Sequence, residues 1–249
     1  MRKQITALYK LFNGEPLARF ELMKKISNLI FPAYQFKWPQ MEWWNNREFN
    51  HYLEKFHEKN GMNSDRHWML DQLLRLTYNV PGDTSECGVY LGASSYLICK
   101  FNAKLKDCSR QHFIFDSFEG LSKPGGNDGS HWSVSDLSAP EESVRKALEE
   151  FAHTTYLKGW IPSRFAEVED KSFSFVHIDV DLYEPTRDSM AFFYPRTNPG
   201  GIILCDDYGF TTCPGATSAV DEFLRNKPEK MISLCSGGGF MIKGCSTQG

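Results

Sequence analysis

Two apolar runs of the sequence, residues 173–179 and 201–206, each end in an aspartate, and further aspartates follow at positions 181 and 207. If these runs are neighbouring strands of a parallel sheet, they lie about 4.8 Å apart. Both strands then finish at the same edge, which brings Asp179 close to Asp206 and Asp207. We expect a cluster of carboxylates at that edge.

Carboxylates that crowd together raise one another's pKa unless a cation lies between them. Oxygen ligands favour magnesium, calcium or manganese over zinc. The pattern therefore predicts a divalent-cation site, with Asp181 as a competitor of Asp179 for the first ligand position. The alternative interpretation, in which the aspartates cap the helices after the strands, accounts for one or two of them.

A glycine-containing loop follows the first expected strand, residues 84–89, and has the pattern E-x-G-x-x-x-G from Glu86 to Gly92. A dinucleotide site needs a middle glycine so that the backbone can approach a pyrophosphate, and this loop lacks it. The loop favours a nucleoside without a pyrophosphate, such as S-adenosylmethionine, with Glu86 facing its amine. We expect contacts to the ligand from Glu86, Gly88, Tyr90 and Ser94, and a plain tight turn is the alternative.

The second expected strand, residues 112–116, ends in Asp116 and Ser117. An acidic side chain at this strand end accepts both hydrogen bonds of a ribose diol in nucleotide-binding sheets. Asp116 is therefore the expected ribose ligand, with Ser117 beside it.

Short strand-like runs alternate with helical patterns from residue 84 onward, which is typical of a parallel sheet covered by helices. Further strands are expected at 154–158, 173–179 and 201–206, and a closing hairpin at 231–235 and 239–243. The expected helices are 93–105, 141–151, 186–194 and 218–225. The sequence thus predicts an α/β domain over residues 81–249.

Residues 1–80 differ from the rest, because they indicate helices and connectors and hold four of the six tryptophans (Trp38, Trp43, Trp44 and Trp68). These aromatics either pack the segment onto the sheet domain or a partner subunit, or form an apolar wall for a substrate. We interpret 1–80 as an N-terminal helical cap, and we expect a homo-oligomer.

The composition excludes several classes of protein. The 28 lysines and arginines are scattered and the formal net charge is -3, which argues against nucleic acid as a partner. No apolar run reaches the roughly 18 residues of a membrane span. Seven cysteines without a C-x-x-C pair favour a reducing compartment, so we expect a cytoplasmic protein.

From about Asp65 to Lys243 the sequence resembles the macrocin O-methyltransferase family, whose known members methylate sugar hydroxyls on antibiotics and related natural products. The resemblance is carried by residues 86–90, 116–121, 158–160, 177–184 and 206–209. The last two motifs in combination are quite specific.

The resemblance implies a class I, Rossmann-like methyltransferase fold, with a seven-stranded sheet and helices on both faces. It implies S-adenosylmethionine across the first two strands, with Gly159 and Trp160 near the adenine. It also implies magnesium bound by Asp179, Asp206 and Asp207, with Asp179 doubling as general base.

Methyl transfer to a hydroxyl needs the acceptor oxygen, the methyl group and the sulfur in line, and an electron-rich oxygen. A cation stabilises the developing alkoxide while Asp179 takes the proton. His131 is a candidate to assist or to contact the small-molecule hydroxyl acceptor, and His177 is expected to be a hydrogen-bonded core residue. The alternatives are a metal-dependent catechol or phenol O-methyltransferase and a non-catalytic binding protein. A nicotinamide oxidoreductase is disfavoured by the missing glycine.

Overall fold

The computed structural model of the chain describes residues 16–30, 42–59, 63–105 and 110–247. The chain forms two compact units, Met1–Tyr52 and Leu53–Gly249. The sequence interpretation placed a boundary at residue 80, whereas helix α4 (Ser64–Leu76) belongs to the larger unit. Leu70, Leu73 and Leu74 of α4 are buried, so this helix is part of the larger unit's core.

The smaller unit contains helix α2 (Pro16–Ile30), the 3₁₀ helix η1 (Glu42–Asn45) and most of helix α3 (Arg47–Lys55). Within it, the Phe49 ring contacts the rings of Trp43 and Tyr52, with centroids 6.1 and 5.6 Å away. Trp38 lies outside the described residues, and Trp68 belongs to the larger unit. A role of the segment as a cap remains a prediction.

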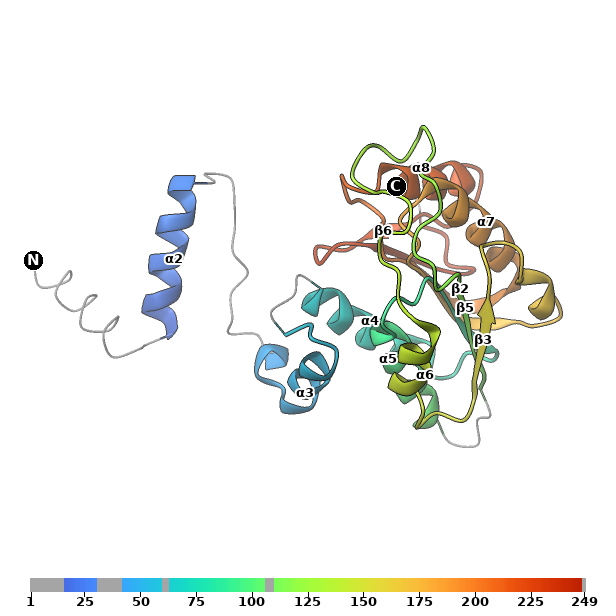
Figure 1. Cartoon of the computed structure of the whole chain (residues 1–249), viewed down its shortest axis with the longest axis horizontal. Coiled ribbons are helices and arrows are strands. Elements are labelled where there is room, and N and C mark those ends of the chain that lie inside the picture. Colours follow the sequence, from blue (N-terminus) through green and yellow to red (C-terminus); the bar gives the residue numbers. More distant parts are fainter. Residues whose placement is uncertain (1–15, 31–41, 60–62, 106–109, 248–249) are drawn as a thin grey trace, which may run out of the picture. The chain divides into compact units, whose positions relative to one another are not determined.

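The larger unit is built on a seven-stranded sheet with the order β3-β2-β1-β4-β5-β7-β6 (Figure 1). The first five strands are parallel, and β7 runs antiparallel to both β5 and β6. The strand bounds are β1 Asp83–Cys87, β2 His112–Asp116, β3 Thr154–Lys158, β4 Phe173–Ile178, β5 Thr197–Cys205, β6 Ile232–Ser233 and β7 Gly239–Ile242. The order reverses between β1 and β4, and this reversal is where sheets of this type bind ligands.

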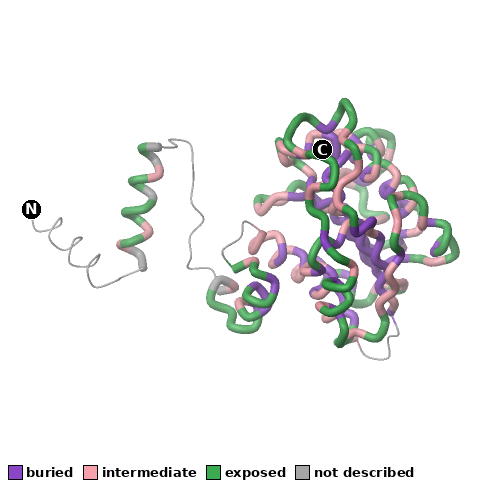
Figure 2. Tube along the Cα trace, viewed as in Figure 1, coloured by how far each residue is buried: buried purple, intermediate pink, exposed green. Residues whose placement is uncertain are grey.

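Helices cover both faces of the sheet, and the alternation of side chains along the strands explains why. On β2, Phe113 and Phe115 belong to one core cluster with Met190 and Phe193, while Ile114 belongs to a second cluster on the opposite face. Figure 2 shows that the buried residues concentrate along the strands. The other helices are α5 Ala93–Ala103, α6 Glu141–Ala147, η2 Phe165–Val168, α7 Tyr183–Phe193, η3 Tyr194–Arg196 and α8 Pro214–Leu224.

Most expected elements are confirmed, and β2 and β3 have the predicted bounds. Two helices begin earlier than predicted: α7 at Tyr183 rather than 186, and α8 at Pro214 rather than 218. In both, a proline (Pro185 and Pro214) lies in the first turn, where the missing N–H removes no helical hydrogen bond. None of the helices in the described ranges combines the length and hydrophobicity of a bilayer span.

Candidate active site

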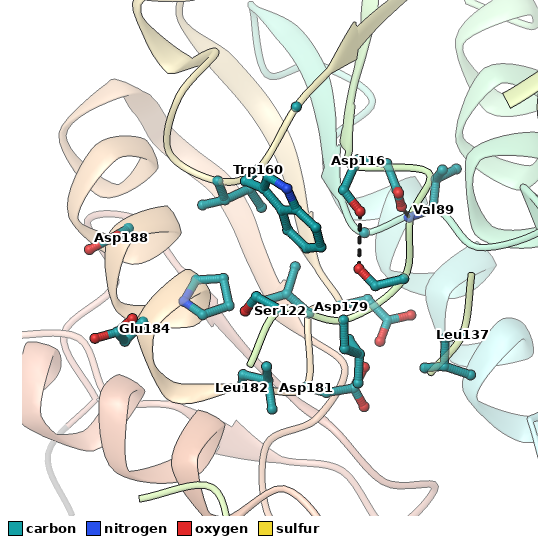
Figure 3. Close-up of a pocket in the computed structure, with 18 of the residues that line it drawn as sticks. Val89, Asp116, Ser122, Leu137, Trp160, Asp179, Asp181, Leu182, Glu184 and Asp188 are labelled. Atoms are coloured by element: carbon teal, nitrogen blue, oxygen red, sulfur yellow. Dashed lines mark hydrogen bonds between the residues drawn. The ribbon is translucent and has the colours of Figure 1, made fainter. Parts of the chain in front are cut away.

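A pocket of about 320 Å³ opens at the carboxyl ends of β1 to β4, at the point where the strand order reverses. Its walls come from the loops after these four strands and from the first turns of α7. In the view of Figure 3, Asp116, Asp179 and Asp181 lie to one side of the Trp160 indole, and Glu184 and Asp188 lie to the other. The volume lies at the lower end of the roughly 300–1,000 Å³ typical of small-molecule sites.

The lining is acidic. Among the described residues it includes five carboxylates and no lysine or arginine; the carboxylates are Asp116, Asp179, Asp181, Glu184 and Asp188. An excess of negative charge in a concave site concentrates its field and attracts cationic ligands. The pocket therefore suits a ligand that carries positive charge.

The loop after β1 approaches the loop after β4 so closely that position 88 excludes any side chain. Gly88 has φ +81°, and a Cβ atom built on it would lie 1.8 Å from the carbonyl oxygen of Asp179. Two backbone hydrogen bonds hold the surroundings: Gly88 N–H to Phe115 O at 2.9 Å, and Asp179 N–H to Cys87 O at 2.8 Å. The glycine seen in the sequence thus lets two strand ends meet at the pocket.

Asp116 ends β2 inside the pocket, as the sequence predicts for a diol ligand. Its Oδ2 accepts a hydrogen bond from Val89 N–H at 2.7 Å, and its Oδ1 accepts one from Phe118 N–H at 2.6 Å. A carboxylate oxygen accepts more than one hydrogen bond, so both oxygens keep capacity for a ligand. The two backbone donors hold the carboxylate in one orientation.

Glu86 does not line the pocket, and the expectation that it faces the ligand's amine does not match the geometry. Its side chain is 1% exposed and accepts a hydrogen bond from the Ser95 hydroxyl, and its Oε1 lies 2.7 Å from Nδ1 of His177. Ser95 Oγ also lies 2.9 Å from Nε2 of His112. Glu86 is thus the centre of a buried polar network between the sheet and α5.

His177 lies between two carboxylates, which confirms the expectation of a hydrogen-bonded core histidine. Its Nδ1 contacts Glu86, and its Nε2 lies 3.6 Å from Oδ1 of Asp206 without a hydrogen bond to any described residue. Burial lowers the pKa of His177, but the two carboxylates outweigh burial and raise that pKa well above its ordinary value. The surroundings of the imidazole therefore favour its protonated form.

Asp179 and Asp206 converge as predicted, because β4 and β5 are neighbouring parallel strands. One ligand atom from each of His177, Asp179 and Asp206 lies within 4.8 Å of the others. Burial, followed by the charges of Asp206 and Asp207, raises the pKa of Asp179 well above its ordinary value. The cluster thus places two carboxylates beside one imidazole.

Asp207 belongs to a separate group with Asp181 and Cys213. Its Oδ2 accepts hydrogen bonds from Val180 N–H at 3.2 Å and from Asp181 N–H at 2.7 Å. Burial, followed by the charge of Asp179, raises the pKa of Asp181 to about 7. The three predicted ligands are thus divided between two adjacent groups, and Asp181, not Asp207, reaches the pocket wall.

Arg66 on α4 places a positive charge beside Asp206. This residue was not identified from the sequence. It forms an ion pair with Oδ2 of Asp206, donates to the backbone oxygen of Asp206 at 3.3 Å, and donates to Asn63 Oδ1 at 2.8 Å. Burial raises the pKa of Asp206, but the charges of Arg66 and His177 outweigh it and lower the pKa to about 2. The sequence contains no signal for Arg66, because it lies in a helix more than 100 residues away from its partner.

Residues other than glycine with positive φ gather at this site. Tyr90 (44°), Leu137 (59°) and Asp181 (60°) line the pocket, and Phe118 (57°) and Ser135 (67°) lie in the loop after β2. Such conformations cost of order 1–3 kcal/mol each and persist where the surroundings hold them in place. Their concentration here supports the assignment of a functional site.

The remaining predicted residues divide into two groups. Gly88, Tyr90, Ser117, Gly159 and Trp160 line the pocket. Ser94, in the first turn of α5, does not, and neither does His131. His131 is exposed and packs edge-on against Trp132, with ring centroids 4.6 Å apart.

The strand order, the antiparallel β7 and the pocket beyond β1, β2 and β4 define a class I methyltransferase fold. The family model for macrocin O-methyltransferase (TylF) matches residues 65–233, and the chain belongs to this family.

Two curated proteins with similar sequences are both named O-methyltransferases. The chain is 30% identical over 152 residues to 8-demethyl-8-(2,3-dimethoxy-alpha-L-rhamnosyl)-tetracenomycin-C 4'-O-methyltransferase of Streptomyces olivaceus, which covers 57% of this chain and 58% of that protein. It is 31% identical over 156 residues to demethyldecarbamoylnovobiocin O-methyltransferase of Streptomyces niveus, covering 58% of this chain and 59% of that one. The chain thus spans about three fifths of the length of these relatives.

Solved structures of other methyltransferases share the fold, among them the following two. The O-methyltransferase NovP is similar with a TM-score of 0.62 and 25% identity, over 72% of this chain and 79% of that chain. The calicheamicin methyltransferase CalS11 is similar with a TM-score of 0.66 and 18% identity, over 86% of this chain and 96% of that chain.

Proposed function

We propose that this chain is an S-adenosylmethionine-dependent O-methyltransferase that acts on a hydroxyl of a small molecule, and that the acceptor is a sugar of a glycosylated natural product. The observation that carries the proposal is the acidic pocket at the carboxyl ends of β1 to β4. S-adenosylmethionine bears a sulfonium and an α-ammonium group, and an acidic pocket complements both. The sugar acceptor is suggested by the relatives, whose names specify O-methylation of rhamnosyl and novobiocin compounds.

Within the pocket, Asp116 is the proposed partner of the ribose diol, since its carboxylate is oriented by two backbone donors. Trp160, which is 42% exposed and lines the pocket, offers an aromatic face for the adenine. Gly88 lets the β1 loop lie against the Asp179 carbonyl, which holds the two loops that would contact the ligand together.

The residues present also fit a hard divalent cation. Asp179 and Asp206 present oxygen donors close together. Burial first, and then the charges of Asp206 and Asp207, raise the pKa of Asp179, and a cation would balance those charges. Asp179 and Asp206 are the proposed ligands, with Asp207 or Asp181 as a third. When bound, magnesium would supply charge stabilisation to the acceptor oxygen as it loses its proton.

Asp179 is the proposed general base. It follows β4 and lines the pocket, where a carboxylate can take the proton of a bound hydroxyl. Arg66 and His177 hold Asp206 ionised from two sides, so Asp206 stays a carboxylate while Asp179 exchanges the proton. We keep a homo-oligomer and a cytoplasmic location as predictions.

The test is transfer of the labelled methyl group of S-adenosylmethionine to a panel of rhamnosides, other glycosides and phenols, with magnesium present. Label in glycosides supports the proposal, and label confined to phenols would redirect it to a phenol O-methyltransferase. Binding of S-adenosylmethionine without transfer to any acceptor would indicate a binding protein. Full methyl transfer in excess chelator, or by the Asp206→Ala variant, would contradict the proposed role of a bound divalent cation.

The donor site is tested separately by calorimetry with S-adenosylmethionine. Asp116→Ala should weaken binding, because the ribose diol loses its acceptor. Asp170→Ala is the matched control, since Asp170 is 71% exposed at its side chain and pairs only with its neighbour Lys171 among the described residues. Equal affinity of the two variants would refute the ribose assignment.

A further inference from the structure

We propose that Asp128 is a positioning residue that holds two walls of the methyl-donor pocket together. The inference rests on the proposed function, because it concerns the same pocket. Asp128 lies in the loop after β2 and is 2% exposed. Every other residue from 121 to 138 is exposed or only partly buried, so this loop buries a single side chain, and that side chain is a carboxylic acid.

The Asp128 carboxylate joins the loop to helix α7. Its Oδ1 accepts a hydrogen bond from the backbone N–H of Tyr183, the first residue of α7, at 2.6 Å. Its Oδ2 accepts one from Gly125 N–H within its own loop, also at 2.6 Å. Short bonds from N–H groups to a carboxylate are charge-assisted, and the first N–H groups of a helix have no partner within the helix. Asp128 thus caps α7 from a position 55 residues earlier in the chain.

Helix α8 leaves no space between itself and this carboxylate. A Cβ atom at Gly215, in the first turn of α8, would lie 2.0 Å from Oδ1 of Asp128. Nearby, the Trp132 indole N–H donates to Sγ of Cys213, the residue before α8, at 3.3 Å. The loop is therefore attached to the starts of both α7 and α8.

The two elements that Asp128 joins both line the pocket. The loop contributes Leu121, Ser122 and Leu137, and α7 contributes Glu184, Pro185 and Asp188. Backbone hydrogen bonds between residue 121 and residues 135 and 136, at 2.9 and 2.8 Å, close the ends of the loop on itself. These bonds leave Asp128 as the link from the middle of the loop to the α7 wall.

The experiment measures the affinity for S-adenosylhomocysteine by calorimetry, because this ligand tests the pocket without a known acceptor. Asp128→Asn removes the charge and places an amide N–H against a backbone N–H, so we expect about 10-fold weaker binding. Hydrogen exchange should become faster both at 121–128 and at the start of α7. Asp136→Asn is the matched control, because Asp136 accepts Ser133 N–H within the same loop at 2.8 Å and does not cap α7. It should bind within about 2-fold of wild type.

A second variant approaches the same contact from α8. Gly215→Ala places a methyl group against the Asp128 carboxylate. Because alanine favours a helix more than glycine does, weaker binding of S-adenosylhomocysteine by this variant would report displacement of that carboxylate. In an Asp128→Ala background the same substitution should cost less, since the 2.0 Å contact with Asp128 is gone and the next atoms, Tyr183 Cβ and N, lie 3.0 Å away. This cycle keeps the inference testable even if Asp128→Asn unfolds.

The outcomes separate the inference from the proposed function. If the wild-type chain does not bind S-adenosylhomocysteine, the proposed function fails. If the wild-type chain binds it and both Asp128→Asn and Gly215→Ala bind equally well, the donor site stands and the role of Asp128 is overturned. Lower melting temperatures with unchanged affinity would give Asp128 a structural role alone, which also overturns the inference.

Discussion

Arg66→Met removes the guanidinium that pairs with Asp206 and keeps much of the apolar volume of the side chain. The side chains of the pair are 19% and 12% exposed, so the interaction is largely shielded from water. The variant leaves Asp206 with His177 as its remaining cationic neighbour, 3.6 Å away. We expect a clear loss of stability.

The size of the loss follows from the pKa of Asp206. The net change from the ordinary pKa of 3.8 to about 2, in which Arg66 and His177 together outweigh burial, corresponds to about 2 kcal/mol at 1.36 kcal/mol per unit. Loss of one partner from a buried pair costs about 3–5 kcal/mol in other proteins. Because Arg66 is partly exposed and His177 remains, we expect a decrease of about 2–3 kcal/mol in the free energy of unfolding.

The assay is urea unfolding with chelator present, so that no divalent cation replaces the guanidinium, between pH 7 and pH 2. The folded pKa of Asp206 is lowered, so its contribution is complete above about pH 4 and is lost as the pH falls toward 2. Without Arg66 the pKa of Asp206 is higher, so in Arg66→Met this carboxylate takes up its proton at a higher pH. The two proteins should therefore differ most near neutral pH and converge in acid.

Arg75→Met is the matched control on the same helix. Arg75 is 62% exposed at its side chain and pairs with Asp71 one turn away, and exposed pairs of this kind contribute about 0.3–0.5 kcal/mol. If Arg66→Met costs no more than Arg75→Met, or if its cost does not shrink toward pH 2, our reasoning about the cluster is refuted.

Three further variants test the site. Gly88→Ala should abolish binding of S-adenosylhomocysteine in calorimetry, because its Cβ would overlap the Asp179 carbonyl, whereas Gly126→Ala, with no atom within 4 Å of the added carbon, should bind normally. Asp179→Asn should retain that binding and lose methyl transfer at least 100-fold in a radiolabel assay, since the base is gone; substantial turnover would exclude Asp179 as the base. Glu86→Gln should lower the free energy of unfolding by about 2–3 kcal/mol in urea, because His177 loses a buried counter-charge, and an unchanged value would contradict the network.

Much of the fold was predictable because it depends on local patterns. The runs at 112–116 and 154–158 are short, β-rich and bounded by turn residues, and they became β2 and β3 without change. The starts of α7 and α8 were predicted three and four residues too far along the chain, in each case beyond a proline. A proline in the first turn of a helix removes no hydrogen bond within that helix.

The site was predictable where a residue's position along a strand decides its neighbours. Asp116 ends β2 and Asp179 follows β4, and because the carboxyl ends of these parallel strands share one edge, both residues reach the pocket. Glu86 also lies near the carboxyl end of a parallel strand, β1, but its partners Ser95 and His177 come from α5 and β4. Its enclosure could not be deduced from strand position.

By itself, the sequence determined the sheet, the acidic edge and the glycine that lets two loops meet, because periodicity and turn chemistry act between residues close in the chain. Only the tertiary structure decided which carboxylates are balanced and which are not. Arg66 reaches Asp206 across 140 residues and Asp128 reaches Tyr183 across 55. Electrostatic and hydrogen-bond energies depend on distances in space, and packing sets those distances.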